Sequence, residues 1–230
     1  MKKNILYILL GIILLTSCKQ DDQIPSEGGY LSVERINLQS QVVVEIASRT
    51  VDETLIVELW KGGEKIRDLS SHEMQDKIKL DVANDYSLKV YSSNYGDELT
   101  WVNEDKGEAV YYMEESFVIE EGKTTPLQLQ VPMITFAVCL DLSQIVGDWL
   151  EDYSFTVTSG ERSVSLRDKE IAYFSYSEGT SFSYQLKVTN SDSEEKEQTG
   201  KWGGESGESL DMNTLYTISY DWNTQSLIIR

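Results

Sequence analysis

The single histidine of the chain, His72, begins the sequence His72-Glu73-Met74-Gln75-Asp76, which is half of the HExxH pattern of zinc proteases. In that pattern two histidines one helical turn apart bind the metal, and the glutamate acts as the base. Asp76 takes the place of the second histidine, and the surrounding sequence is typical of a loop between strands. We therefore expect no zinc site here.

Other hydrolytic or phosphate-binding patterns are equally incomplete. The stretch Glu121-Gly122-Lys123-Thr124 ends like a phosphate-binding loop, but Phe117 stands where that loop needs its first glycine. We expect a β-turn there, with Gly122 at a positive φ. A serine or cysteine nucleophile would have only His72 as its base. A pair of carboxylates acting on a glycoside stays open in principle, although composition selects no pair among 39 acids. We expect no enzyme activity, no metal and no cofactor.

Aromatic residues are the remaining candidates for binding, and they crowd the stretch from residue 91 to residue 112. Exposed Trp and Tyr rings can stack against sugars, but sandwich cores also bury many of them. The sequence leaves both alternatives open. The candidate ligand-binding residues are Tyr95, Trp101, Tyr111 and Tyr112.

Two acidic segments also need an interpretation. The segment from Asn103 to Glu108 faintly suggests a calcium loop but lacks the ligand spacing of an EF-hand. We expect it to be a solvated loop. The segment from Ser191 to Glu197 is predicted to be an exposed hairpin tip.

The overall charge excludes one class of partner. The 230 residues carry a formal net charge of −19, so there is no basic excess to neutralise nucleic-acid phosphates, and we expect no nucleic-acid partner. Two cysteines are too few for a disulfide scaffold, and 40% apolar residues are compatible with packed cores.

The N-terminus predicts the location of the protein. Lys2 and Lys3 precede an apolar run from Ile5 to Leu15, which is too short for a membrane-spanning helix of about 20 residues. Such a run is typical of a signal peptide. It is followed by Leu15-Thr16-Ser17-Cys18, which looks like a bacterial lipoprotein box. An ordinary secretory signal with an incidental cysteine is the alternative.

The lipoprotein interpretation makes residues 1–17 a signal peptide and Cys18 the lipidated residue, with outer-membrane lipid as its partner. Residues 18–28 would be a flexible tether. The sequence Lys19-Gln20-Asp21-Asp22 resembles the surface-export signal of Bacteroidetes lipoproteins. We expect a lipid-anchored outer-membrane protein displayed on the cell surface, with a periplasm-facing protein as the alternative.

From Gly29 onward, apolar and polar residues alternate with a period near two, which predicts strands. Turn signals separate them, among them the Gly-Gly hairpin at Lys61–Glu64 and the pair Asn84-Asp85. Strands at intervals of about 8–12 residues are the signature of antiparallel sandwiches. We predict an all-β protein with two tandem sandwiches, residues 29–132 and 133–230. Cys139, in an apolar strand, is expected to be a buried thiol.

Several strand patterns carry a family resemblance. They are Gly29–Val33, Tyr86–Val90, Tyr111–Met113, Phe117–Gly122, Leu127–Leu129, Ile134–Val138, Asp152–Val157 and Asn213–Ile218. Together with Cys18 they resemble a family of Bacteroidetes lipoproteins related to fimbrillin-like pilus and tip subunits. The resemblance implies two transthyretin-like sandwiches without enzyme activity. It also implies fimbrial subunits as partners, because relatives of this kind donate a strand to the next subunit.

These observations predict a non-catalytic, surface-anchored lipoprotein that is an adhesin-like or fimbria-associated structural or binding module. Its partner would be a fimbrial subunit, a host surface or a glycan. The alternative is a glycan-binding lipoprotein of a polysaccharide-uptake system, with Trp101, Tyr111 or Tyr112 as the stacking platform.

Overall fold

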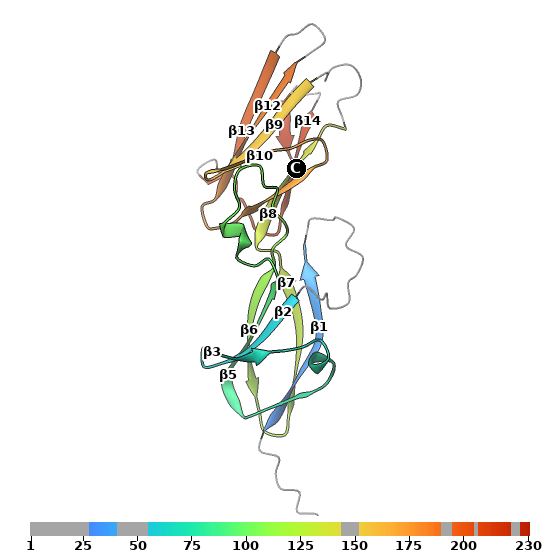
Figure 1. Ribbon diagram of the computed structural model, residues 1–230, viewed down its shortest axis with the longest axis vertical. Helices are drawn as coiled ribbons and strands as arrows, with labels where there is room; N and C mark the ends of the chain where they lie inside the picture. The colour runs from blue at the N-terminus through green and yellow to red at the C-terminus, as the bar shows by residue number, and fades with distance from the viewer. Residues whose placement is uncertain (1–27, 41–54, 144–151, 190–194, 205–206, 222–225) are drawn as a thin grey trace, which may run out of the picture.

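The computed structural model describes residues 28–40, 55–143, 152–189, 195–204, 207–221 and 226–230. Figure 1 shows two β-sandwiches arranged end to end along the long axis of the molecule, which confirms the predicted fold class. The predicted signal peptide, Cys18 and nearly all of the tether lie outside the described residues. No helix in the described residues is long and apolar enough to cross a membrane.

The first sandwich consists of a three-stranded and a four-stranded sheet. The smaller sheet has the order β4-β1-β7, with β1 at Gly29–Gln39, β4 at Ile78–Leu80 and β7 at Thr124–Pro132. The larger sheet has the order β3-β2-β5-β6, with β2 at Leu55–Lys61, β3 at Glu64–Asp68, β5 at Ala83–Ser92 and β6 at Tyr112–Ile119. Mostly aliphatic side chains fill the space between them, including Leu31, Val57, Leu59, Leu88, Val90, Leu129 and Val131.

Two of the predicted turns are confirmed. Gly62 and Gly63 have φ values of 58° and 83°, the pattern of a tight hairpin turn between β2 and β3. Gly122, with φ at 68°, makes the turn between β6 and β7, so the phosphate-loop pattern is a strand connection.

The predicted turn at Asn84-Asp85 is wrong. Both residues lie inside β5, where the register with β6 shifts between Ala83 and Tyr86. Two residues of β5 thus lie opposite one residue of β6, which makes the site a β-bulge. Asn and Asp tolerate the irregular backbone of a bulge as readily as that of a turn, so the sequence signal was real but its consequence was different.

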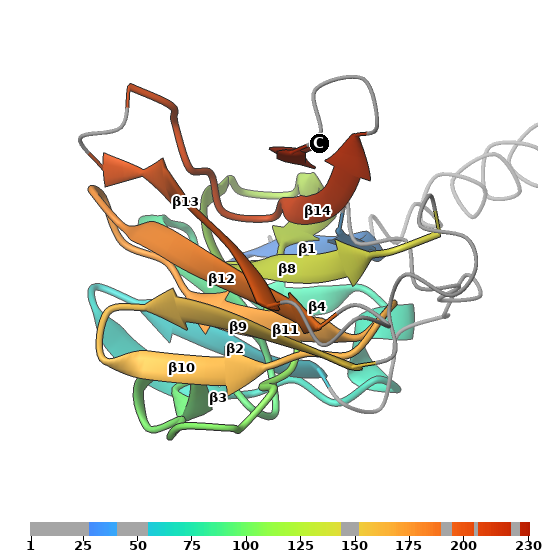
Figure 2. The same ribbon diagram turned by 90° about the horizontal axis from the view of Figure 1, so that it is seen from above.

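The second sandwich consists of two four-stranded sheets. One has the order β10-β9-β12-β13 and forms a continuous layer in Figure 2: β9 at Asp152–Ser159, β10 at Arg162–Ser165, β12 at Ser181–Thr189 and β13 at Glu195–Gly203. The other has the order β11-β8-β14-β15: β8 at Thr135–Asp141, β11 at Ile171–Ser175, β14 at Leu215–Asp221 and β15 at Ser226–Ile229.

The core of the second sandwich is rich in phenylalanine, with Phe136, Phe155, Phe174 and Phe182 all fully buried. Cys139 is buried and in no disulfide, as predicted, and burial raises the pKa of its thiol. The segment from Ser191 to Glu197 is expected from the sequence to be a hairpin tip, but its last three residues belong to a strand, because β13 begins at Glu195. Residues 190–194 lie outside the described residues.

Most strand pairs are antiparallel, but each sandwich contains one parallel pair: β1 with β7, and β8 with β14. In both sandwiches the first strand thus pairs in parallel with a strand near the end of the same sandwich. The predicted boundary at Pro132 stays a prediction, since Ala137, Ile171, Tyr173 and Leu215 of the second segment pack against the core of the first.

Candidate ligand-binding face

The outward face of the sheet β3-β2-β5-β6 carries an unusual row of apolar and aromatic residues. Alternation turns Val57 and Leu59 of β2 into the core and leaves Ile56, Glu58 and Trp60 on the other face. The register places Ile56 opposite Tyr91 of β5, and Tyr91 opposite Tyr112 of β6. The row therefore crosses three neighbouring strands.

Tyr95, from the turn after β5, completes this row. Its ring stacks on Tyr112 with centroids 4.7 Å apart and planes 13° apart, and lies 5.4 Å from Tyr91. The turn is held by the Tyr95 amide, which donates to the carbonyl of Ser92 at 2.9 Å. Tyr95 is 43% exposed. We call Tyr91, Tyr95 and Tyr112 the tyrosine cluster.

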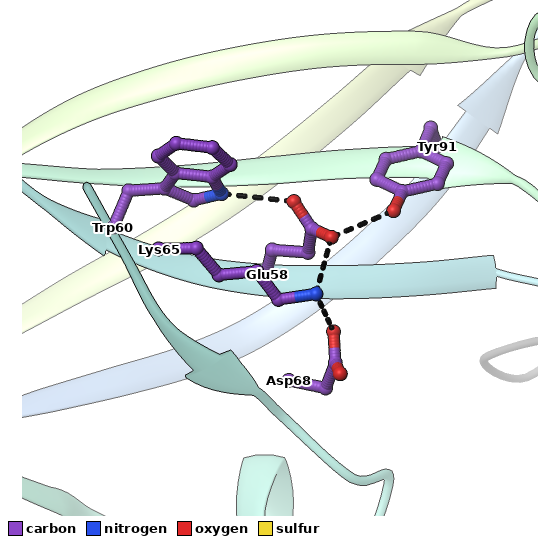
Figure 3. Close-up of polar contacts among 5 residues, drawn as sticks. All are labelled: Glu58, Trp60, Lys65, Asp68 and Tyr91. Carbon is purple, nitrogen blue, oxygen red and sulfur yellow. Dashed lines mark hydrogen bonds and ion pairs between the residues drawn. The ribbon is translucent and has the colours of Figure 1, made fainter. Parts of the chain in front are cut away.

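A charged row lies beside the tyrosine cluster, and its centre is Glu58 (Figure 3). The Glu58 carboxylate accepts hydrogen bonds from the indole of Trp60 at 2.9 Å, the ammonium of Lys65 at 2.6 Å and the hydroxyl of Tyr91 at 2.8 Å. Lys65 also pairs with Asp68 at 2.8 Å. These bonds fix the orientation of the Tyr91 ring, so the network holds one member of the tyrosine cluster in place.

The network also determines which groups are charged. Desolvation alone would raise the pKa of Glu58, but the hydrogen bonds from Lys65, Tyr91 and Trp60 outweigh it and hold that pKa below its ordinary value. Desolvation and the bond to Glu58 raise the pKa of Tyr91. The bonds to Asp68 and Glu58 raise the pKa of Lys65. At neutral pH the site therefore holds an anionic carboxylate, a cationic lysine and a neutral phenol.

Trp60 is less available than its position suggests. The ammonium of Lys89 lies 3.7 Å from the centroid of its ring and 3.8 Å from the carboxylate of Glu114. A cation over an aromatic face occupies the surface on which a ligand would stack. The tyrosine cluster is thus the open aromatic surface of this face.

The structure separates the four predicted residues into two groups. Tyr95 and Tyr112 are brought together in the tyrosine cluster. Tyr111 faces the opposite side of the chain, is buried in the first core and forms a bridge with Met133. Trp101 is half-buried under the guanidinium of Arg162, whose carbon lies 4.9 Å from the ring centroid.

Trp101 belongs to a contact between the two sandwiches, formed by residues 101–107, which we call the junction loop (Figure 1). Arg162 of β10 donates to the carbonyls of Tyr173, at 2.6 Å, and Asp105, and it also lies 4.7 Å from the ring of Phe174. Lys106 pairs with Glu170 at 2.7 Å.

The polar residues of this loop, expected to be solvated, bond to the second sandwich. Asn103 accepts from the amide of Ser163 at 2.9 Å, and Glu104 accepts from the amide and hydroxyl of Ser165, each at 3.1 Å. Among the described strands β10 is an edge strand paired with β9, and the loop covers its other side.

Sequence reasoning missed Glu58 and Trp60 as parts of this face, and it placed Tyr91 in the aromatic stretch without naming it as a binding residue. The signal available was alternation, because Glu58 and Trp60 occupy the polar phase of a strand whose other phase is apolar. The alternation shows that Glu58 and Trp60 point outward. Their approach to Tyr91 depends on the register between β2 and β5, which cannot be read from the sequence.

The incomplete zinc pattern has a structural role. Glu73 bonds to the amide of Ser70 at 3.0 Å and to its hydroxyl at 2.8 Å, and the Ser70 hydroxyl accepts from the Glu73 amide. This reciprocal arrangement has the hydrogen-bond pattern of a capping box, and it holds the turn that leads into the 3-10 turn η2 at Glu73–Gln75, whose N-cap is His72. Within the described residues, no group of three His, Cys, Asp or Glu side chains could hold a metal ion.

The fold and this surface define a class: a tandem β-sandwich protein with an exposed tyrosine cluster on its first sandwich. The chain belongs to the family described as Domain of unknown function (DUF4493), whose model matches residues 27–229. No curated protein matches it in sequence.

Solved structures with a similar arrangement come from Bacteroides species. A candidate adhesin from Bacteroides ovatus is 8% identical with a TM-score of 0.43, over 88% of this chain and 92% of that one. A candidate cell adhesion protein from Bacteroides eggerthii is 8% identical with a TM-score of 0.41, over 85% and 86%. A candidate polysaccharide-binding protein from Bacteroides thetaiotaomicron is 11% identical with a TM-score of 0.30, over 88% and 96%. At TM-scores below 0.5 these likenesses carry no functional inference.

Proposed function

We propose that this protein is a non-catalytic, lipid-anchored adhesin-like module that binds its ligand through the tyrosine cluster. The observation that supports this is the Tyr95–Tyr112 stack, in which Tyr95, 43% exposed in the turn after β5, rests on a tyrosine of the sheet. Exposed aromatic side chains held rigidly by their neighbours lose little entropy on binding, so they make effective binding surfaces.

The binding role is tested by attaching the purified full chain to a sensor and measuring capture of cells or isolated cell-surface material. Tyr95→Ala and Tyr112→Ala remove the stack and should each reduce capture at least about tenfold, the scale of a binding hot spot. Tyr30→Ala is the matched control, because Tyr30 lies on β1 in the other sheet. Equal loss in all three variants would mean that capture does not use the cluster.

The anchor is a separate part of the proposal. Lipidated Cys18 would hold the chain in the outer membrane, with residues 19–28 as tether and the sandwiches on the cell surface. Cys18→Ser should move the protein from the detergent phase to the aqueous phase, whereas Cys139→Ala, which changes the buried thiol, should not. Surface display is tested by protease treatment of intact cells, since a periplasm-facing protein would be protected.

A second candidate function is glycan capture within a polysaccharide-uptake system. The observation that favours it is the exposed ring of Tyr95, which carries its own hydroxyl, because sugars present both C–H faces and hydroxyl groups. A structural role beside fimbrial subunits is the outcome if neither cells nor glycans bind through the cluster.

A further inference from the structure

The exposed member of the tyrosine cluster offers two contacts to a ligand. One ring face of Tyr95 packs on Tyr112, and its hydroxyl makes no hydrogen bond within the described residues. By contrast, the hydroxyl of Tyr91 is committed to Glu58 at 2.8 Å, and that of Tyr112 points to Glu114 at 3.4 Å. Tyr95 thus offers an apolar ring face and a hydroxyl, which can contact the C–H face and the hydroxyl groups of a pyranose.

The cations of this face are already occupied. Lys65 lies between Glu58 at 2.6 Å and Asp68 at 2.8 Å. Lys89 lies over the ring of Trp60 and near Glu114. An anionic ligand gains binding energy from an arginine or lysine without another partner. Among the described residues of the charged row, Lys65 and Lys89 already contact carboxylates or an aromatic ring.

Carboxylates, in contrast, outnumber cations in the charged row, because Glu58, Asp68 and Glu114 lie there against Lys65 and Lys89. Glu58 and Glu114 lie in the adjacent row, and Glu98, in the turn beyond Tyr95, accepts from the amide of Gly96 at 2.7 Å. Glu108 lies 3.4 Å from the side chain of Asn94. Like charges repel an anionic chain approaching the cluster, and the net charge of −19 adds to this at longer range.

From this arrangement we propose that the ligand of the tyrosine cluster is an uncharged polysaccharide, and that the neighbouring carboxylates exclude anionic chains. This inference rests on the proposed binding role of the cluster. The patch is narrow for a protein partner. The row crosses three strands, about 10 Å, and the exposed large apolar residues in it are Ile56 and Tyr95, at 36% and 43%; Val118, at 47%, lies farther along β6 on the same face. A stable protein interface buries roughly 800 Å² on each side.

The test uses pairs of polysaccharides that share a backbone and differ in charge: dextran with dextran sulfate, fully methyl-esterified polygalacturonate with polygalacturonate, and xylan with glucuronoxylan. Binding of the purified full chain is measured by affinity electrophoresis and by calorimetry. At least one neutral chain should bind, and its charged counterpart should bind at least about tenfold more weakly at low salt. Added salt should narrow that difference, because it screens the carboxylates.

Two variants make the result specific. Tyr95→Ala should abolish binding of the neutral chain, whereas Tyr30→Ala, in the other sheet, should leave it unchanged. Glu114→Gln removes one bordering charge without touching Tyr95 and should improve binding of the charged counterpart relative to the neutral chain.

The outcomes separate the two levels of proposal. If a charged chain binds as well as its neutral partner, the ligand class is wrong although the cluster binds. If no polysaccharide binds but Tyr95-dependent capture of cells or of a protein persists, the glycan inference fails and the adhesin-like function stands. If Tyr95→Ala and Tyr112→Ala change no binding at all, both proposals are overturned.

Discussion

The two sandwiches use their aromatic residues in opposite ways. The first keeps a mainly aliphatic core and places Trp60, Tyr91, Tyr95 and Tyr112 on the outward face of a sheet. The second buries its phenylalanines, with Phe136 stacked on Phe174 at 5.4 Å and on Phe182 at 5.8 Å. The first sandwich also buries Tyr86, Tyr111 and Phe117, so the two sandwiches differ in the outward aromatic row, which we propose binds a ligand.

The difference also follows from the side chains themselves. Phenylalanine has no polar atom and can be buried without a hydrogen-bond partner, whereas the hydroxyl of tyrosine needs one when it is buried. On the first sandwich Tyr91 satisfies its hydroxyl through Glu58, and Tyr95 leaves its own at the surface. We therefore expect substitutions in the second sandwich and the junction loop to change stability, and substitutions in the tyrosine cluster to change binding.

The largest effect is expected from Arg162→Ala, which removes the cation that holds the junction loop. Two carbonyls, those of Tyr173 and Asp105, lose a charged donor. We expect a loss of about 2–3 kcal/mol and separate unfolding of the two sandwiches, because bonds to charged donors are among the stronger ones. Calorimetry measures both. Arg67→Ala, which removes an exposed pair with Glu73, is the control and should cost much less, because solvent screens an exposed ion pair.

An unchanged single transition in Arg162→Ala would show that apolar contacts such as those of Ile171 and Leu215 with the first core are enough to couple the sandwiches. In that case the junction loop would be a surface contact, and its difference from the tyrosine cluster would disappear.

The next effect is expected at Gly107, in the same loop. Its φ is 61°, and an added Cβ would lie 2.9 Å from the ring of Trp101. Gly107→Ala should lower the free energy of unfolding by about 1–3 kcal/mol, because the alanine strains the backbone at a positive φ and also displaces the Trp101 ring. Gly122→Ala is the matched control, because its φ is 68° and nothing lies within 4 Å of the added atom. Urea denaturation measures the free energy of unfolding of both variants. Equal values for Gly107→Ala and Gly122→Ala would contradict a tight fit around Trp101.

Glu58 tests the network behind the cluster. Its folded pKa lies below its ordinary value, so the unfolded chain binds the proton more readily. The stability that its carboxylate contributes is therefore complete above the ordinary pKa, near 4.5, and is lost as the pH falls through the lowered folded pKa. Glu58→Gln should cost about 1–2 kcal/mol at pH 7 and should flatten the decline of stability below pH 4.5.

The control for this prediction is Glu114→Gln, which changes an exposed carboxylate of the neighbouring strand. Urea midpoints at pH 7 and at several values below pH 4.5 give the comparison. A decline in Glu58→Gln as steep as in the parent protein would mean that other carboxylates account for the acid sensitivity.

The fold was accessible from the sequence because alternation with period two is a local property, and so were the hairpin glycines Gly62 and Gly63. The site was only half accessible. Tyr111 and Tyr112 must face opposite sides of a strand, but which one meets the core depends on what covers each side. Trp101 lies in a loop, where period two has no meaning, and its partner Arg162 is 61 positions away in the chain. Contacts of that kind depend on tertiary packing.

The smallest effect on stability and the largest on binding are expected together at Tyr95. Its ring rests on Tyr112 and Tyr91 at the surface, so Tyr95→Ala should lower stability by no more than about 1 kcal/mol, the scale of an exposed aromatic pair. Tyr95→Phe keeps the ring and removes only the free hydroxyl. If the ring stacks on the ligand, Tyr95→Phe should keep most of the binding that Tyr95→Ala loses. Equal loss in the two variants would mean that the hydroxyl carries the recognition, and a loss of stability as large as that of Arg162→Ala would remove the distinction between a binding surface and a structural junction.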